Sequence, residues 1–165
     1  MLLKLLAQLR EVGVTIAFDP NYRSTMWQDI EHAKFWLSNA YQHSDIVLPG
    51  LQEHNILWGH KNHQLVADYF SRVNVTELVI KCDEQGVYGY QQNMLVAHQP
   101  FKAAPVQVDS TAAGDSFAGT FLAARLDEKS IQHSIADACE MASIVVQHKG
   151  AILTDEVYRT ALNHH

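Results

Sequence analysis

The sequence predicts an α/β fold in three layers, with a mostly parallel sheet flanked by helices and one small antiparallel hairpin. Two observations carry this prediction. Apolar residues recur at helical spacing and are followed by a short β-branched run, and this unit repeats three times within residues 1–81. The first such run, residues 14–18, is nearly all apolar, which is typical of a parallel strand buried on both faces.

The first unit is a helix that leads directly into a strand. Leucines recur at helical spacing through residues 2–9, and Gly13 ends the pattern where a helix C-cap is expected. Residues 14–18 then form the strand, which Asp19 and Pro20 close.

Two further units follow the same order. Residues 27–41 place their apolar side chains on one helical face, and residues 45–48 form the next apolar strand. A helix over 65–73 and a strand over 77–81 complete the third unit. Three helix-strand units in tandem predict neighbouring parallel strands.

The remaining residues change the pattern. Residues 87–90 and 94–98 are separated by three polar residues, which predicts a hairpin at the edge of the sheet. A further short strand is expected at 106–108. Helices are expected around 117–126, 130–147 and 155–163. No internal repeat and no linker is visible, so residues 1–165 are predicted to form a single domain.

Composition narrows the classes of function. Twelve basic and eighteen acidic side chains give a formal charge of -6, which argues against general nucleic-acid binding. The apolar runs are too short to cross a bilayer, so we expect no membrane partner and a cytoplasmic location. Cys82 and Cys139 lie far apart, which favours two reduced, buried thiols over a disulfide.

The most informative stretch is residues 109–119, where small side chains precede an apolar helix. Ala112, Ala113 and Gly114 let backbone N–H groups approach a ligand closely. The helix that begins near Asp115 directs its free N–H groups to the same point, as in sites that bind phosphate. Asp115 would add a carboxylate able to deprotonate an attacking hydroxyl, as a kinase base does. The alternative is that Asp115 is only a helix cap, with turn bonds from Ser110 and Thr111.

Residues 109–119 resemble the second signature of the PfkB, or ribokinase-like, carbohydrate kinases. The resemblance implies that Asp115 is the catalytic base and that the amides of Ala112, Ala113 and Gly114 form an anion hole for the γ-phosphoryl group of ATP, with Mg²⁺ as cofactor. Ala112 stands where glycine is commoner. If the backbone there has positive φ, the site is strained by about 1 kcal/mol or more.

A second segment resembles the 2-keto-3-deoxygluconate kinase branch of this family. The segment is residues 19–23, with Trp27 four residues further on. The resemblance implies that Asn21, Tyr22 and Arg23 lie near nucleotide phosphates and that Arg23 also contacts substrate, since its planar guanidinium can grip a carboxylate or phosphate. The alternative for Arg23 is a surface ion pair with a nearby aspartate, Asp19 or Asp29. Trp27 is expected in the core.

Two shorter segments also resemble motifs of this family, and each differs from its motif at one residue. Residues 81–86 are similar to the family's nucleotide-lining turn, which implies that Lys81 and Gly86 line ATP, but Asp83 replaces a glycine. Glu53 matches an element linked indirectly to Mg²⁺, while Gly50 stands where asparagine is usual.

The resemblance also extends to the end of the chain. The turn at Gly150 resembles the one that flanks adenine, and in some relatives the positions of Asp109 and Thr111 help to hold a monovalent cation such as K⁺. Ten histidines raise the possibility of a metal site, but the spacing of His54, His60 and His63 fits no zinc motif. A dinucleotide-dependent oxidoreductase would need a Gly-x-Gly-x-x-Gly turn, and the sequence has none.

The resemblance covers the C-terminal, nucleotide-binding half of such a kinase; the N-terminal half and its lid are not matched. It implies ATP-dependent phosphorylation of a small sugar acid, with 2-keto-3-deoxygluconate converted to its 6-phosphate as the favoured reaction. Fructokinase or ribokinase activity is the nearest alternative. A non-catalytic, truncated nucleotide-binding remnant is another. The partners expected are the sugar acid and ATP, and formation of a homo-oligomer stays open.

Overall fold

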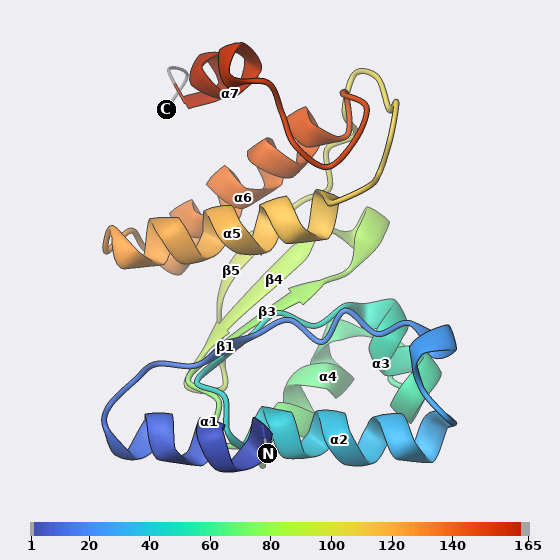
Figure 1. The fold of residues 1–165 in the computed structure, drawn as a ribbon, viewed down its shortest axis with the longest axis vertical. Helices are drawn as coiled ribbons and strands as arrows, with labels where there is room; N and C mark the ends of the chain where they lie inside the picture. Colours follow the sequence, from blue (N-terminus) through green and yellow to red (C-terminus); the bar gives the residue numbers. More distant parts are fainter. Residues whose placement is uncertain (1, 163–165) are drawn as a thin grey trace. The chain divides into compact units, whose positions relative to one another are not determined.

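Five strands form one mixed sheet in the order β1-β2-β3-β4-β5 (Figure 1). The first three strands pair in parallel and the last two add antiparallel. Their bounds are Ala17–Phe18, Ile46–Val47, Glu77–Lys81, Val87–Gln91 and Met94–Gln99. The α/β class and the hairpin are therefore confirmed, although the parallel strands β1 and β2 are shorter than the predicted runs.

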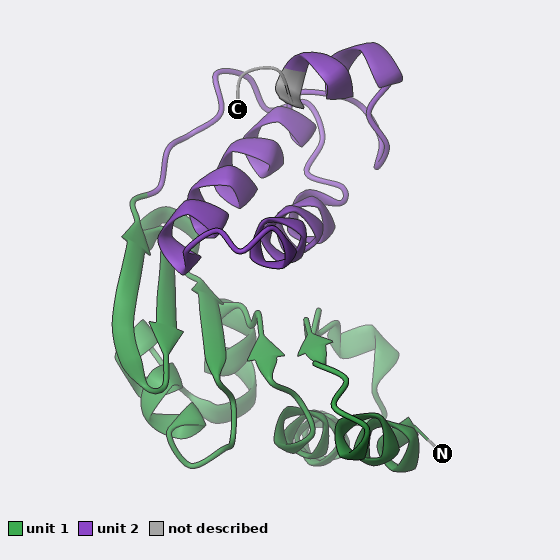
Figure 2. Ribbon diagram, turned by 90° about the vertical axis from the view of Figure 1, so that its left-hand side faces the viewer, with its two compact units in different colours: residues 1–100 green, residues 101–165 purple. Residues whose placement is uncertain are grey.

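The computed structural model describes residues 2–162. It divides into two compact units, residues 1–100 and residues 101–165 (Figure 2). No helix within the described residues is long and apolar enough to cross a membrane.

Four helices belong to the first unit. They are α1 (Leu2–Glu11), α2 (Ile30–Gln42), α3 (Leu51–Trp58) and α4 (His63–Phe70), and two short 3₁₀ turns, η1 (Ser24–Met26) and η2 (Asp83–Gln85), follow β1 and β3. Helix α3 was not predicted, because its apolar spacing is short and His54 interrupts it. Its signals are Glu53 in the first turn and Gly59, whose φ of 75° closes the helix.

Tyr41 lies at the centre of the core of the first unit. It is 1% exposed, and its ring meets Phe70 and Phe18 at centroid distances of 4.9 and 5.7 Å. Strand β3 supplies Leu78 and Ile80 to the same cluster. Trp27 packs against this core while partly exposed, which agrees with its predicted packing role. Aromatic edge-to-face contacts of this kind add to the burial of apolar area.

Asp45 connects the first strands to each other and to α1. Its carboxylate accepts hydrogen bonds from Arg10 at 3.0 Å and from the backbone of Ile16 at 2.9 Å. Its carbonyl accepts from the backbone N–H groups of Thr76 and Glu77. One residue therefore sets the register in which α1, β1, β2 and β3 begin.

The predicted strand at 106–108 is wrong. Val106 and Val108 are more than half exposed, and the segment has no strand partner among the described residues. The N–H groups of Val108 and Asp109 instead donate to the carbonyl of Val146, at 2.8 and 3.2 Å. The β-branched pattern indicated an extended backbone, but this backbone binds the end of a helix.

The second unit is helical. It contains α5 (Ala113–Leu126), α6 (Ile131–Val145) and α7 (Asp155–Leu162). Helices α5 and α6 pack together and bury Phe121, Ile135 and Ala138 completely. Three helices were predicted here, and the expected end of the last one, Asn163, lies outside the described residues.

Helix α5 begins with a strained residue. Its N-cap is Ala112, whose φ of 62° is in the left-handed region and which offers no side-chain cap. An L-residue other than glycine costs about 1–3 kcal/mol in such a conformation. The backbone at Ala112 therefore has the positive φ that, as noted from the sequence, strains this loop.

Both cysteines are free, as predicted, with Cys82 buried and Cys139 half-buried. Burial raises the pKa of the Cys82 thiol to about 12 and that of Cys139 to about 11. Both thiols therefore stay protonated and unreactive near neutral pH.

Acid should destabilise the first unit through His54. The imidazole is fully buried, and burial followed by the nearby His60 lowers its pKa to about 3. The unfolded chain binds this proton near pH 6.5, so stability is complete above that pH and is lost as pH falls toward 3. We expect a loss of about 3 kcal/mol between pH 6.5 and 4 from this group, since one pKa unit corresponds to about 1.4 kcal/mol.

The measurement is urea unfolding followed by tryptophan fluorescence, because Trp27, Trp36 and Trp58 all lie in the first unit. His54→Leu should flatten the dependence of unfolding free energy on pH. His133→Gln, at an exposed histidine of α6, should leave it as in the parent chain. Equal pH dependence in His54→Leu and the parent would contradict this assignment.

Glycine at position 112 should stabilise the second unit. Ala112→Gly removes the left-handed strain and should raise the unfolding free energy by about 1 kcal/mol. Ala113→Gly is the matched control: it lies one residue later, inside the helix, and should lower stability by up to about 1 kcal/mol. Urea unfolding followed by far-UV circular dichroism compares the two, and a lower midpoint for Ala112→Gly would disprove the strain.

Candidate active site

The carboxyl ends of β1, β2 and β3 meet at one edge of the sheet. Asp19 follows β1, Pro49 and Gly50 follow β2, and Lys81 ends β3. The N–H of Lys81 donates to the carbonyl of Pro49 at 2.9 Å, which extends the parallel pairing to this edge. In open α/β sheets, ligands bind outside the carboxyl ends of the strands.

Glu53 joins two of the loops at this edge. One carboxylate oxygen accepts from the N–H of Gly50 at 3.0 Å and the other from the N–H of Tyr22 at 2.9 Å. Burial raises the pKa of Glu53, against the lowering effect of these hydrogen bonds and of Lys81. A Cβ on residue 50 would lie only 3.3–3.4 Å from the Glu53 side chain. Gly50 therefore leaves room for the carboxylate that caps its own N–H.

Lys81 and Asp19 form an ion pair across the same edge. The ammonium Nζ lies 2.7 Å from Oδ2 of Asp19, and both side chains are about four-fifths buried. The other oxygen, Oδ1, accepts from the N–H of Asn21 at 3.2 Å. Asn21 has a φ of 40°, so the chain turns sharply there. The lysine thus fixes the loop that carries Asn21, Tyr22 and Arg23.

Arg23 is exposed, and no side chain of the described residues forms an ion pair with it. The two aspartates considered as its partners are engaged elsewhere: Asp19 binds Lys81, and Asp29 accepts from the N–H of His32 as the cap of α2. Its guanidinium is therefore available to an external anion, and the surface ion-pair alternative is not observed.

The turn after β3 contains two residues with positive φ. Gly86 has φ 86° and ψ -153°, a region open essentially to glycine alone. Asp83 has φ 47°, so it occupies a conformation that glycine would adopt without cost. The resemblance placed a glycine at position 83, and the backbone explains why.

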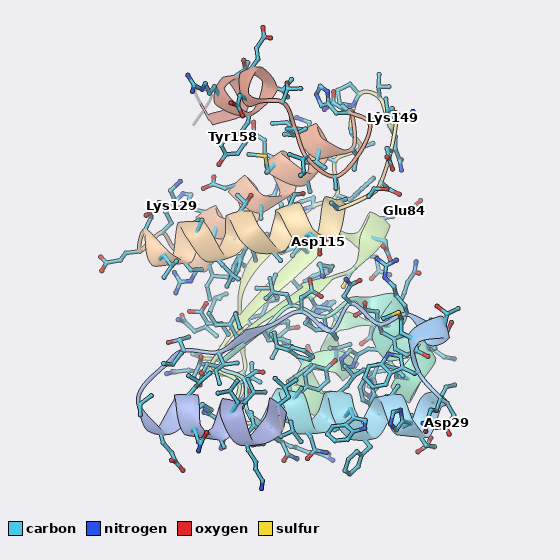
Figure 3. All side chains as sticks on the ribbon, viewed as in Figure 1. Asp29, Glu84, Asp115, Lys129, Lys149 and Tyr158 are labelled. Carbon is cyan, nitrogen blue, oxygen red and sulfur yellow. The ribbon has the colours of Figure 1, made fainter. Side chains whose placement is uncertain are left out.

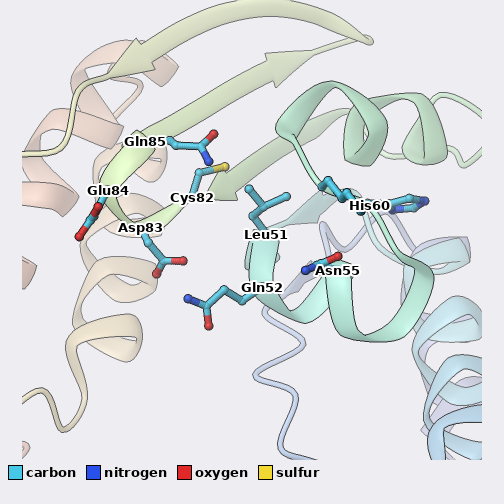
Figure 4. Close-up of a pocket in the computed structure, with 9 residues that line it drawn as sticks. Leu51, Gln52, Asn55, His60, Cys82, Asp83, Glu84 and Gln85 are labelled. Atoms are coloured by element: carbon cyan, nitrogen blue, oxygen red, sulfur yellow. The ribbon is translucent and has the colours of Figure 1, made fainter.

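A cavity of about 440 Å³ lies between this turn and α3 (Figure 4). Cys82, Asp83, Glu84 and Gln85 form one wall, and Gln52 and Asn55 of α3 face it. The lining is mixed in charge, because Asp83 and Glu84 supply carboxylates and Lys61 supplies an ammonium group.

In the second unit, the start of α5 presents a carboxylate beside free backbone N–H groups. Asp115 is the third residue of the helix; its side chain is exposed and has no partner among residues 2–162 (Figure 3). The N–H groups of Ala112 and Gly114 have no acceptor in the described part of the chain, whereas that of Ala113 donates to the carbonyl of Ser110 at 3.2 Å. The capping alternative for Asp115 is not observed, because Ala112 occupies the N-cap.

Asp109 holds this loop in place. Its carboxylate accepts from the N–H of Thr111 at 2.9 Å and from the N–H of Gly150 at 3.0 Å. Hydrogen bonds from Thr111 and then Gly150 lower the pKa of Asp109, so it is ionised. Gly150 has a φ of 89°, which lets its N–H turn toward the aspartate. The predicted residues Asp109, Thr111 and Gly150 are therefore brought together.

The predicted site residues thus form two groups, one in each unit. Asn21, Tyr22, Arg23, Glu53, Lys81 and Gly86 belong to the first, and Asp109, Thr111, Ala112, Ala113, Gly114, Asp115 and Gly150 to the second. Sequence reasoning missed that Glu53 and Asp109 bind backbone N–H groups. The signals were available: a glutamate three residues after a helix cap, and an Asp-x-Thr turn.

Metal-binding side chains do not cluster in the described residues, where no three His, Cys, Asp or Glu side chains come together. His54 and His60 approach within 3.1 Å through their Nδ1 atoms, but His54 is buried among aromatic rings. The carboxylates of Asp19 and Glu53 already bind Lys81 and backbone N–H groups. These residues alone do not make a Mg²⁺ site, so a Mg²⁺ ion that accompanies ATP would be held mainly by the nucleotide phosphates.

The relatives that this chain resembles in sequence are named as kinases of sugars or sugar acids. The 2-dehydro-3-deoxygluconokinases of Haemophilus influenzae and Dickeya dadantii are 29% and 32% identical to this chain, each over 154 residues and 92% of it. Fructokinase-1 of Zea mays is 30% identical over 151 residues and 87% of the chain. The matches cover 49%, 50% and 46% of these three proteins, so the chain spans about half the length of the curated relatives it matches.

A solved structure shows the same fold. A protein assigned as ribokinase II from Escherichia coli, crystallised with ATP and Mg²⁺, superposes with a TM-score of 0.78 at 27% identity, covering 98% of this chain and 53% of that one. The sequence model of the pfkB family carbohydrate kinases matches residues 1–157. From its fold, its signature loop and this match, the chain belongs to the pfkB family of carbohydrate kinases.

Proposed function

We propose that the chain is the C-terminal, nucleotide-binding half of a kinase that transfers the γ-phosphoryl group of ATP to a small sugar acid. The observation that carries this proposal is the start of α5, where the unpartnered carboxylate of Asp115 lies one residue from the free N–H of Gly114. A carboxylate beside an anion site weakens simple phosphate binding. It is useful where a hydroxyl must be deprotonated as it attacks phosphorus.

Asp115 acts as the general base. Its carboxylate accepts the proton of the sugar hydroxyl while that oxygen forms a bond to the γ-phosphorus and the bond to the β–γ bridging oxygen breaks. The products are the sugar phosphate and ADP. The N–H groups of Ala112 and Gly114, with the positive end of the α5 dipole, bind the equatorial oxygens of the transferred group. Ala113 contributes by fixing the turn through its bond to Ser110.

The edge of the sheet in the first unit orients the charged ligands. Arg23 binds a phosphate or the carboxylate of the sugar acid, because its guanidinium is exposed and unpaired. Glu53 and Lys81 hold the loop from which Arg23 extends, through Tyr22 and Asp19. Gly86 shapes the turn that lines the nucleotide.

Mg²⁺ bound with ATP would neutralise charge on the phosphates. The ionised carboxylate of Asp109 and the hydroxyl of Thr111 are the groups that would face a monovalent cation such as K⁺. Asp109 keeps its loop in shape without that ion, since both of its oxygens already accept backbone N–H groups.

The favoured substrate is 2-keto-3-deoxygluconate, phosphorylated at its 6-hydroxyl. Two relatives named for this activity and the presence of Arg23, which suits a carboxylate, support it. Fructose and ribose are the alternatives, because relatives with those kinase names match the chain as well. The rate of ADP release with 2-keto-3-deoxygluconate, fructose and ribose, each at the same concentration, distinguishes these three substrates.

A non-catalytic nucleotide-binding remnant is the alternative from another class. It is favoured by Asp83 and Glu84, which add negative charge to the nucleotide-lining turn. Binding of ATP without turnover, even in the presence of the half that the relatives possess in addition, would support the remnant.

Replacing Asp115 should abolish turnover while ATP still binds. We expect Asp115→Asn to lower kcat by about 100- to 10,000-fold, because a positioned base contributes a factor of this size. The assay measures ADP release with 2-keto-3-deoxygluconate for the chain co-expressed with the unmatched half of the Dickeya dadantii kinase. The chain alone should be slower by roughly two to four orders of magnitude, because groups that bind substrate and exclude water are missing.

Asp127→Asn is the matched control, an exposed aspartate at the other end of α5, and should leave kcat within about threefold. Calorimetric titration with ATP should give a Kd for Asp115→Asn that is equal to or lower than that of the parent, because the substitution removes a negative charge beside the phosphate. Retained turnover in Asp115→Asn would refute its role as base, and robust turnover by the chain alone would refute its role as an incomplete half.

A further inference from the structure

Three aromatic rings form a stack beside the turn that follows β3. The ring of Tyr88, on β4, lies between the imidazoles of His63, at the start of α4, and His98, on β5. The ring centroids are 3.6 and 4.3 Å apart, with interplanar angles of 7° and 10°. Tyr88 and His98 are also partners in the antiparallel pairing of β4 with β5. Stacking on both faces of Tyr88 therefore restricts the rotation of both imidazoles.

One end of the stack is fixed by a short hydrogen bond. Nδ1 of His63 lies 2.6 Å from the hydroxyl oxygen of Tyr90, a residue that is buried. Burial, followed by the nearby His98, lowers the pKa of His63, so its ring is neutral near pH 7. A neutral imidazole keeps one nitrogen that can accept the Tyr90 hydroxyl. His63 is thereby a fixed platform on which the other two rings stack.

The other end of the stack reaches the turn itself. Nε2 of His98 lies 3.2 Å from the carbonyl oxygen of Gln85, in η2. A carbonyl can only accept, so Nε2 carries a proton and is the donor of this bond. The turn contains backbone that is costly to hold: residues 83–85 are exposed, and φ is positive at Asp83 and Gly86. A hydrogen bond from the neighbouring strand opposes the relaxation of that backbone.

We propose that His98 is a positioning residue, which holds the turn after β3 in the shape that binds ATP through its bond to the Gln85 carbonyl. The inference rests on the proposed function, in which this turn lines the nucleotide. The stack on Tyr88 sets the direction of the His98 donor before any ligand arrives, so ATP meets a turn that is already ordered. His98 itself touches neither ATP nor the sugar. It acts through the turn alone.

Alkylation of Cys82 measures the state of the turn without nucleotide. This thiol stands at the start of the turn and is 2% exposed, so iodoacetamide reacts with it freely only when the turn opens. Peptide mass spectrometry distinguishes it from Cys139, which lies in the second unit and serves as the internal reference. His98→Phe keeps a ring to stack on Tyr88 but has no N–H donor. We expect it to raise the rate at Cys82 about fivefold and to leave the rate at Cys139 unchanged.

Two further variants complete the comparison. His98→Gln loses the ring but keeps a side-chain N–H donor, so alkylation of Cys82 should stay within about twofold of the parent. Met94→Phe is the matched control: it introduces the same phenyl ring at a 64% exposed position at the other end of β5, and it should also stay within about twofold.

Nucleotide binding is measured on the same variants. Calorimetric titration with ATP should give a Kd about fivefold higher for His98→Phe, and values near that of the parent for His98→Gln and Met94→Phe. For the chain co-expressed with the unmatched half of the Dickeya dadantii kinase, the KM for ATP of His98→Phe should rise by the same factor while kcat stays within about twofold. The turn binds the nucleotide equally in the ground state and the transition state, which changes KM rather than kcat.

Equal alkylation of Cys82 in His98→Phe and the parent would overturn the proposal, and so would a rise that His98→Gln shares. A rise matched by an equal loss of unfolding free energy, followed by tryptophan fluorescence, would overturn it too, because unfolding of the whole unit would then expose the thiol. Faster alkylation with an unchanged Kd for ATP would refute the link to the nucleotide. If the parent chain binds no ATP, the proposed function fails, and the alkylation rates still decide whether His98 holds the turn.

Discussion

One half-buried carboxylate, that of Glu53, determines the shape of the sheet edge in the first unit. It satisfies the N–H of Gly50 at the start of α3 and the N–H of Tyr22 in the loop after β1. Burial opposes its charge, and the two hydrogen bonds and nearby Lys81 compensate. The loop that carries Arg23 is thereby tied to the next helix rather than left to solvent.

Asp109 follows the same principle in the second unit, where it ties the loop before α5 to the turn after α6. In both units, an acidic residue that resembles a metal-associated position binds backbone N–H groups directly. Asp115, which we propose as the base, has no side-chain partner among the described residues. It needs none to shape its loop, because Asp109 already holds the segment before α5.

The sequence was most informative where periodicity and motif agreed. The hairpin was predicted almost to the residue, since Gln92 and Asn93 form the tight turn with positive φ that joins such strands. The loop before α5 was placed correctly from its small residues. Helix α3 was missed because eight residues carry too little periodicity, and 106–108 was misassigned because valines favour extended backbone without requiring a strand partner. The bonds of Glu53 and Asp109 to distant N–H groups depend on tertiary positions that spacing does not reveal.

The connections made by Asp45 also order the folding of the first unit. This residue collects partners from Arg10, Ile16 and Thr76, up to 35 positions away, so its hydrogen bonds form only after long loops have closed. Helix α1 has no buried residue, and its Arg10 bonds to Asp45 and to the carbonyl of Gln42. We therefore expect the amide hydrogens of α1 to exchange before those of the buried strand β3.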